Sequence, residues 1–257
     1  MRRRDATEGL LRNGVIELGS SDHYGEIREL FLDASEALRD PSVAAIFQDW
    51  AEQWSCEVGG ALHPGLSPRI RNRPPGDRRG HKDAIQTTPG MYWIAQQYGS
   101  GGVPVPFLRL MAALEKGQQQ AAKVFRSVLP LHFMPTLVTS RIIGYREGAQ
   151  LGQGWHKDPS IATIIHRGPG DNHLMIKPPN EGGQIVTAPE SETASAVMIT
   201  GSSSGSVLPG TEPLQHAVRP IESGQLRLSI TYFLWPAPIS WAGMMGMKPM
   251  RDEPMAA

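Results

Sequence analysis

The sequence predicts a mainly β fold with flanking helices, and three observations support this class. From about residue 136 the apolar residues recur at every second position, which is the period of a half-buried strand. Glycine (28) and proline (22) are frequent among the 257 residues, well above their usual combined share of roughly 12%, so many turns are expected. One long helical stripe, over residues 106–129, precedes the strands and predicts a helix laid against a sheet.

Seven short candidate strands follow one another in the second half of the chain, with glycine- and proline-rich turns between them. They cover residues 136–146, 161–166, 173–177, 184–188, 195–200, 214–219 and 225–234. Short strands at this close spacing indicate an antiparallel sandwich or barrel.

The first half of the chain is expected to be helical around one strand. The basic N-terminus is predicted to be frayed and solvated, and a turn at Asn13-Gly14 leads into a strand that ends near residue 18. Apolar residues at helical spacing then predict helices over residues 22–39, 42–54 and 106–129.

Residues 57–106 differ from the rest of this half because they are rich in glycine and proline. Five arginines lie between Arg69 and Arg79. A long segment of this composition is expected to be a mobile loop or lid. Its arginines form either a solvated surface or a site for an anionic group of a substrate. The tail, residues 237–257, is rich in methionine and proline and is expected to be flexible.

Charge and cysteine content exclude several classes of function. Lys+Arg and Asp+Glu number 25 each, so the chain lacks the basic excess of a general nucleic-acid binder or of a protein held to membranes by charge. No apolar stretch reaches the length of a transmembrane helix, and no secretory signal opens the chain. The single cysteine, Cys56, excludes an internal disulfide and a thiolate metal site, and it favours a reducing cytoplasm.

A histidine and an aspartate at a spacing of two residues are the first candidates for chemistry. In extended backbone, His156 and Asp158 point to the same side, so both can face one metal ion. His216, at the start of a later candidate strand, can supply a third ligand. Two imidazoles and one carboxylate form the facial triad of non-haem Fe(II) oxygenases, which leaves coordination positions open. By itself the short motif is also compatible with a surface histidine near a loop aspartate.

An arginine and a serine share one face of the last candidate strand. Arg227 and Ser229 offer a guanidinium fork and a hydroxyl, which together suit a carboxylate. The alternative is that Arg227 faces outward from a half-exposed strand. The other histidines have no partner at ligand spacing and are expected to be structural or exposed: His23, His63, His81, His132, His166 and His173.

Taken together, these motifs resemble the isopenicillin N synthase-like branch of the Fe(II)/2-oxoglutarate oxygenase superfamily. The block GQGWHKDPSIATII is similar to that family's H-[TS]-D followed by an apolar strand. The block HAVRPIESGQLRLSITYFLWP is similar to its H-x-V and R-x-S ending. The resemblance extends over roughly residues 10–40 and 105–236, and its motifs are specific in combination.

The resemblance implies a double-stranded β-helix (jelly-roll) core backed by the long helix. It implies Fe(II) held by His156, Asp158 and His216, with 2-oxoglutarate and O₂ as co-substrates. Arg227 and Ser229 would bind the distal carboxylate of 2-oxoglutarate, and Tyr145 would contact the same molecule. Trp155 is expected to pack, and Lys157 to point away from the metal.

The expected organisation is one oxygenase domain over residues 1–257, with helices, a strand and the long loop in 10–135 and the jelly-roll core in 136–236. The expected activity is oxidation of an unactivated C–H bond of a small molecule, with hydroxylation preferred over desaturation or cyclisation, in amino-acid or natural-product metabolism. Two alternatives stay open: an iron oxidase of the same fold that does not use 2-oxoglutarate, and a non-catalytic jelly-roll binding module. The resemblance does not carry the substrate over, and the oligomeric state is open.

Overall fold

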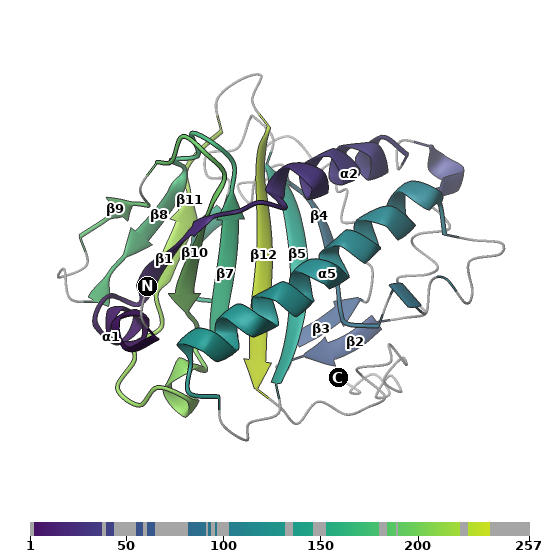
Figure 1. The fold of residues 1–257 in the computed structure, drawn as a ribbon. Coiled ribbons are helices and arrows are strands. Elements are labelled where there is room, and N and C mark those ends of the chain that lie inside the picture. Colours follow the sequence, from purple (N-terminus) through teal and green to yellow (C-terminus); the bar gives the residue numbers. More distant parts are fainter. Residues whose placement is uncertain are drawn as a thin grey trace, which may run out of the picture.

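A computed structural model gives the arrangement of the helices and strands (Figure 1). It describes residues 3–37, 40–43, 55–58, 61–64, 82–90, 92–93, 96, 103–131, 136–145, 153–179, 184–188, 190–221 and 226–236.

A six-stranded antiparallel sheet, called the major sheet, forms the centre of the molecule. Its strand order is β1-β10-β7-β12-β5-β4. The strands are β1 (Val15–Ser20), β4 (Lys82–Thr87), β5 (Thr136–Tyr145), β7 (Ala162–Arg167), β10 (Ser195–Thr200) and β12 (Arg227–Pro236). β12 is central, because it pairs with β5 on one side and β7 on the other.

A four-stranded sheet, called the minor sheet, completes the β core. Its order is β6-β11-β8-β9, from β6 (Gln153–His156), β8 (Leu174–Lys177), β9 (Val186–Thr187) and β11 (Gln215–Val218). Every neighbouring pair in both sheets is antiparallel. The seven predicted strands are all present with boundaries shifted by at most two residues, and the mainly β class with a jelly-roll core is confirmed.

Helices cover one face of the major sheet. The long helix α5 (Val105–Val128) runs across β7, β12 and β5, and α2 (Tyr24–Ala37) lies beside it (Figure 1). Apolar residues of α5 recur at helical spacing and are buried, among them Phe107, Leu114 and Phe125. They pack with α1 (Arg3–Asn13), α2 and the helix-facing residues of the sheet in one large apolar core.

Successive residues of the major sheet face different surroundings, as the period of two predicts. On β7, Ile164 packs in the core under the helices, whereas its neighbour Ile165 packs in a second core with residues of the minor sheet. β10 repeats the pattern with Met198 and Val197. The side chains that face the minor sheet therefore line the space between the two sheets, where the candidate site lies.

Two sequence predictions need correction. The N-terminus is not frayed from Arg3 onward, because α1 begins there and buries Ala6 and Leu10. A loop over residues 57–106 is wrong for part of this segment. β2 (Ser55–Val58) pairs with β3 (Ala61–Pro64), and β4 forms the edge of the major sheet.

Other predictions fall wholly or largely outside the described residues. They concern the arginine-rich run 69–79, the tail 237–257 and most of the predicted helix 42–54, of which only residues 42–43 are described, as helix. In the described part of the chain, no helix has both the length and the apolar character that crossing a membrane requires.

Candidate functional site

Two histidines of the minor sheet lie directly opposite each other. His216 on β11 pairs with His156 at the end of β6, and their ring centroids are 4.1 Å apart. Directly opposed residues on antiparallel strands bring their side chains close on one face of the sheet. The pairing of β6 with β11 thus joins two residues that are 60 positions apart in the sequence (216 − 156).

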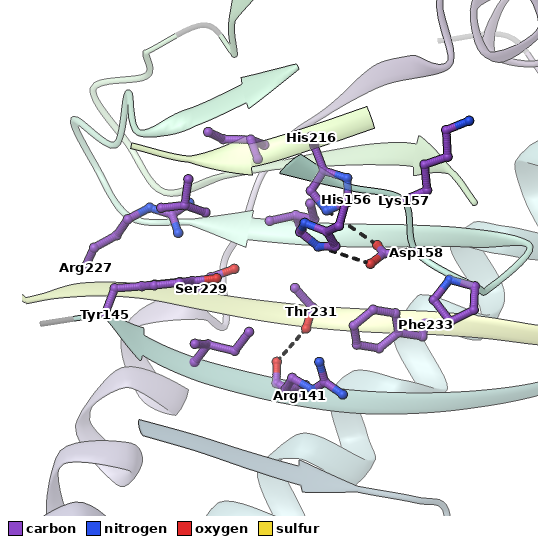
Figure 2. A pocket seen from close by; sticks show the side chains of 15 residues that line it. Arg141, Tyr145, His156, Lys157, Asp158, His216, Arg227, Ser229, Thr231 and Phe233 are labelled. Atoms are coloured by element: carbon purple, nitrogen blue, oxygen red, sulfur yellow. Dashed lines mark hydrogen bonds and ion pairs between the residues drawn. The ribbon is translucent and has the colours of Figure 1, made fainter. Parts of the chain in front are cut away.

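The carboxylate of Asp158 completes the group. Its Oδ1 lies 3.7 Å from Nε2 of His156, and its Oδ2 lies 3.7 Å from Nε2 of His216 (Figure 2). These distances exceed a hydrogen bond, so three lone-pair-bearing atoms converge without being paired to one another. The potential ligand atoms of the three residues all lie within 4.8 Å of one another.

Neighbouring groups hold the Nδ1 atoms of both histidines and the carboxylate of Asp158 in place. Nδ1 of His156 lies 2.8 Å from the carbonyl of Gly154, and Nδ1 of His216 lies 3.5 Å from the carbonyl of Leu214. A carbonyl fixes the proton on Nδ1, which leaves Nε2 free to bind a metal ion. Thr163 donates a hydrogen bond to Asp158 Oδ2 at 2.7 Å. Burial lowers the pKa of His216, which favours the neutral, ligating imidazole.

The predicted carboxylate receptor lies at one end of the same space. Arg227 and Ser229 face the space between the sheets from β12, and Tyr145 is the Cα partner of Arg227 on β5. All three side chains are buried, and the Arg227 guanidinium carbon lies 5.0 Å from the centre of the Tyr145 ring. Burial raises the pKa of Tyr145, so its hydroxyl keeps its proton. The alternative of an outward-facing Arg227 is wrong.

Arg227 also makes a buried ion pair that the sequence analysis missed. Its Nε lies 2.9 Å from Oδ2 and 3.0 Å from Oδ1 of Asp171, which follows the turn after β7. Burial alone would raise the pKa of Asp171, but hydrogen bonds from His173 and the charge of Arg227 hold it well below its usual range. The aspartate therefore stays ionised and engages only one edge of the guanidinium.

The two terminal amino groups of Arg227 are buried and have no hydrogen-bond partner among the described residues. Native proteins rarely leave buried donors in this state, because each costs about 1–3 kcal/mol. A second buried arginine, Arg167, stands next to Ser229 in the sheet and reaches the backbone carbonyl of Asp171. Asp171 lies beside both guanidinium groups, and Glu17 adds a second negative charge near Arg167. The terminal amino groups of Arg227 remain the part of this cluster that a bound carboxylate would satisfy.

The triad and Arg227 line one cavity of about 180 Å³. Figure 2 shows Arg227, Ser229 and Tyr145 at one end, and the triad farther along β12, across from Thr231, Phe233 and Arg141. The remaining walls are mostly apolar: Ile143, Pro159, Ile165, Leu174 and Val218. The arrangement offers a metal position and an anion receptor in one partly enclosed space with both polar and apolar walls.

The residues around the triad behave as predicted. Lys157 extends away from the three ligands (Figure 2). Trp155 packs under Lys177, whose ammonium lies 4.2 Å from the ring centre. Of the other described histidines, His23 and His166 lie near each other on the helix side of the major sheet, with ring centroids 4.7 Å apart. His173 contacts Asp171 and so belongs to the surroundings of Arg227.

Comparisons with known proteins find structural relatives only. No family profile matches the sequence, and no curated protein matches it. The fold is similar to dioxygenase for auxin oxidation 1 from Arabidopsis thaliana in a complex with 2-oxoglutarate, with TM-score 0.58 and 16% identity over 92% of this chain and 88% of that one. It is also similar to Neurospora crassa T7H in complex with alpha-KG and thymine, with TM-score 0.59 and 15% identity over 91% and 80%.

A third similar structure is JOX2 in complex with 2OG, Fe and JA, with TM-score 0.58 and 12% identity over 92% of this chain and 72% of that one. The chain has the fold of the Fe(II)/2-oxoglutarate-dependent dioxygenases. At these identities the oxygenase fold is shown, whereas the particular branch is not. Within this oxygenase fold, the triad, Arg227, Ser229 and Tyr145 face one cavity, and their roles stay predictions.

Proposed function

We propose that the protein is an Fe(II)- and 2-oxoglutarate-dependent dioxygenase that oxidises an unactivated C–H bond of a small molecule, with hydroxylation as the expected outcome. One observation carries the proposal. The convergent triad of His156, Asp158 and His216 shares a cavity with Arg227, whose terminal amino groups are buried without a partner. A metal ion alone would use only the triad, and a single carboxylate would use only the arginine. A ligand that chelates a metal and carries a second carboxylate uses both.

The residues that line the cavity fit Fe(II) and 2-oxoglutarate in number and chemistry. Two imidazole nitrogens and one carboxylate oxygen suit Fe(II) and leave open positions for the co-substrates. When bound, iron with 2-oxoglutarate and O₂ supplies the oxidant for the C–H bond. The protein's own part is to hold 2-oxoglutarate through Arg227 and Ser229, to place the reacting carbon, and to exclude water with the apolar walls. The single cysteine favours a reducing cytoplasm as its location.

The proposal is tested by adding Fe(II) and then 2-oxoglutarate to the metal-free protein without air. A visible iron-to-2-oxoglutarate charge-transfer band is expected. His216→Ala should abolish both iron binding and the band. Gln215→Ala, an exposed change on the same strand, should preserve both. Arg227→Met should keep the iron but weaken 2-oxoglutarate binding at least tenfold, whereas Arg109→Met on the exposed side of α5 should not.

The same experiment separates the alternatives. Iron binding without the band favours an oxidase of this fold that does not use 2-oxoglutarate, in which Arg227 holds a carboxylate of the main substrate. A protein that binds no iron is not an oxygenase, and the non-catalytic binding module then stands.

A further inference from the structure

The carboxylate of Asp158 is the one group of the triad that does not come from a strand. β6 ends at His156, β7 begins at Ala162, and Asp158 lies between them. The terminal torsion of an aspartate is broad and roughly two-fold, so the backbone alone does not decide which carboxylate oxygen faces a metal ion. The two oxygens are also equally placed, because each lies 3.7 Å from Nε2 of one of the histidines (Figure 2). Another contact must distinguish them.

A buried hydroxyl makes this distinction. Thr163 on β7 is fully buried and donates a hydrogen bond of 2.7 Å to Oδ2 of Asp158, whereas no described residue donates one to Oδ1. The hydroxyl of Ser160, also fully buried, lies 3.0 Å from that of Thr163. A threonine hydroxyl has a single hydrogen, and Asp158 accepts it, so Ser160 is the donor in the second bond. The two hydroxyls form a directed chain that ends on Oδ2, and each bond of such a chain strengthens the other.

The backbone around Asp158 is fixed as well, by a turn over residues 201–204. The N–H of Ser202 donates to the carbonyl of Asp158 at 2.7 Å, and the N–H of Ser203 donates to the carbonyl of Ser160 at 3.1 Å. Gly201 allows this close approach, because a Cβ there would stand 2.0 Å from the carbonyl oxygen of Ser160. The two hydroxyls therefore act on the carboxylate from fixed positions.

The number of carboxylate oxygens on the metal decides whether both co-substrates fit. Two imidazoles and one carboxylate oxygen leave three positions of an octahedron open. A chelating 2-oxoglutarate needs two of them, and O₂ needs the third. A carboxylate that bound through both oxygens would occupy one of these positions. A hydrogen bond that engages Oδ2 and fixes the rotation of the carboxylate prevents this.

We propose that Thr163 is a positioning residue that keeps Asp158 a ligand through one oxygen, Oδ1, and that Ser160 supports it. This inference rests on the proposed function and adds to it the group that keeps a coordination position open. Thr163 is not among the residues that line the cavity, so it acts through Asp158 and not on a co-substrate.

The test compares three substitutions of Thr163, starting from metal-free protein without air. Calorimetry gives the affinity for Fe(II), and the charge-transfer band gives the affinity for 2-oxoglutarate at saturating Fe(II). Thr163→Val and Thr163→Ala lack the hydroxyl, one with its volume kept and one without added bulk. Each should lose at least tenfold in Fe(II) affinity, as is usual when a partner of a metal ligand is removed, and at least tenfold in 2-oxoglutarate affinity. Thr163→Ser keeps the hydroxyl and should stay within threefold of the wild type in both.

A matched control removes a buried hydroxyl elsewhere. Thr87 lies on the edge strand β4 and is hydrogen-bonded to Ser140 and Gln118. Thr87→Val should lower the melting temperature, as the loss of any buried hydrogen bond does, but leave both affinities within threefold of the wild type.

Three results would overturn the inference. If the folded variants without the hydroxyl lose less than tenfold in Fe(II) affinity, Thr163 is not needed for ligation. If they lose Fe(II) affinity but less than tenfold in 2-oxoglutarate affinity, the hydroxyl does not keep a position open. If Thr163→Ser loses as much as they do, or Thr87→Val does, the effect is one of packing or stability. Failure of the proposed function is distinct from all three, because the wild-type protein then binds no Fe(II) or shows no band.

Discussion

At the residue scale, Arg227 shows how one side chain is divided between structure and ligand. Its Nε is held by Asp171, a residue 56 positions away, while its terminal amino groups face the cavity. An unrestrained arginine side chain loses considerable rotamer freedom when it binds a carboxylate. In Arg227 the buried ion pair with Asp171 has already restricted the rotamers, so less freedom remains to be lost on binding. The aspartate thus orients the guanidinium before any ligand arrives.

Asp171→Asn tests the charge balance of this cluster. The asparagine oxygen still accepts from Nε, so the orientation is kept, but Arg167 and Arg227 then lose the buried negative charge that lies beside both of them. Breaking a buried pair costs about 3–5 kcal/mol of folding free energy. Addition of 2-oxoglutarate supplies the missing negative charge, so it should raise the melting temperature of the variant more than that of the wild type. Thermal unfolding with and without 2-oxoglutarate measures this. An equal rise in both proteins would show that Asp171 does not balance the cluster.

Sequence patterns identify some residues of the site and miss others for a physical reason. His156 and Asp158 are recognisable because their spacing of two residues alone places them on one side of extended backbone. Arg227 and Ser229 are recognisable for the same reason. Asp171 and Arg141 carry no such local signal. Their positions follow from strand register and from the turn after β7, which pair them with residues far along the chain. The triad's convergence likewise depends on the pairing of β6 with β11.

At the scale of elements, β4 shows where hydrophobic periodicity fails. Its described buried side chains are Ile85 and Thr87, so only one large apolar residue marks the strand. The burial of Thr87 is made favourable by hydrogen bonds to Ser140 on β5 and Gln118 on α5. A pattern of apolar residues cannot indicate a strand whose buried polar side chains are hydrogen-bonded to partners on other elements.

Helix α5 shows the opposite case, in which a residue unfavourable to the local structure is required by packing. Gly117 weakens a helix in isolation, and replacing it by alanine in an exposed helix would gain about 1 kcal/mol. Here a Cβ would stand 1.9 Å from the hydroxyl oxygen of Tyr232, which is fully buried on β12. The glycine allows the helix and the sheet to approach.

We therefore expect Gly117→Ala to destabilise the protein. Overpacking a core costs about 1–3 kcal/mol, which meets or exceeds the gain in helix propensity. Tyr232→Phe removes the closest atom, so the same substitution should cost less in that background. Urea unfolding of the wild type, both single variants and the double variant gives the coupling energy. A substitution that costs the same in both backgrounds would contradict this contact.

At the scale of the whole molecule, β12 separates two polar systems. Its odd-numbered residues from Arg227 to Phe233 face the cavity, while Leu228, Ile230, Tyr232 and Leu234 face the helices. On the helix side, His166 lies 2.7 Å from the hydroxyl of Ser21 and packs edge-on against Tyr232. Alternate residues of β12 thus line the candidate site on one face of the major sheet and pack against the helices and the N-terminal segment on the other.

This separation predicts an acid sensitivity of folding that does not involve the metal site. Histidine titrates near pH 6.5 in an unfolded chain, whereas burial, and then the nearby His23, lowers the pKa of His166 to about 3. Between these two pH values the unfolded chain binds more protons than the folded protein does. The contribution of His166 to the free energy of unfolding is therefore complete above pH 6.5 and decreases as the pH falls. The loss is up to about 1.4 kcal/mol per pH unit. His166→Gln, measured by urea unfolding of the metal-free protein, should flatten the dependence between pH 6.5 and 5. An unchanged slope would assign the acid sensitivity to other groups, because the substituted position can no longer take up a proton.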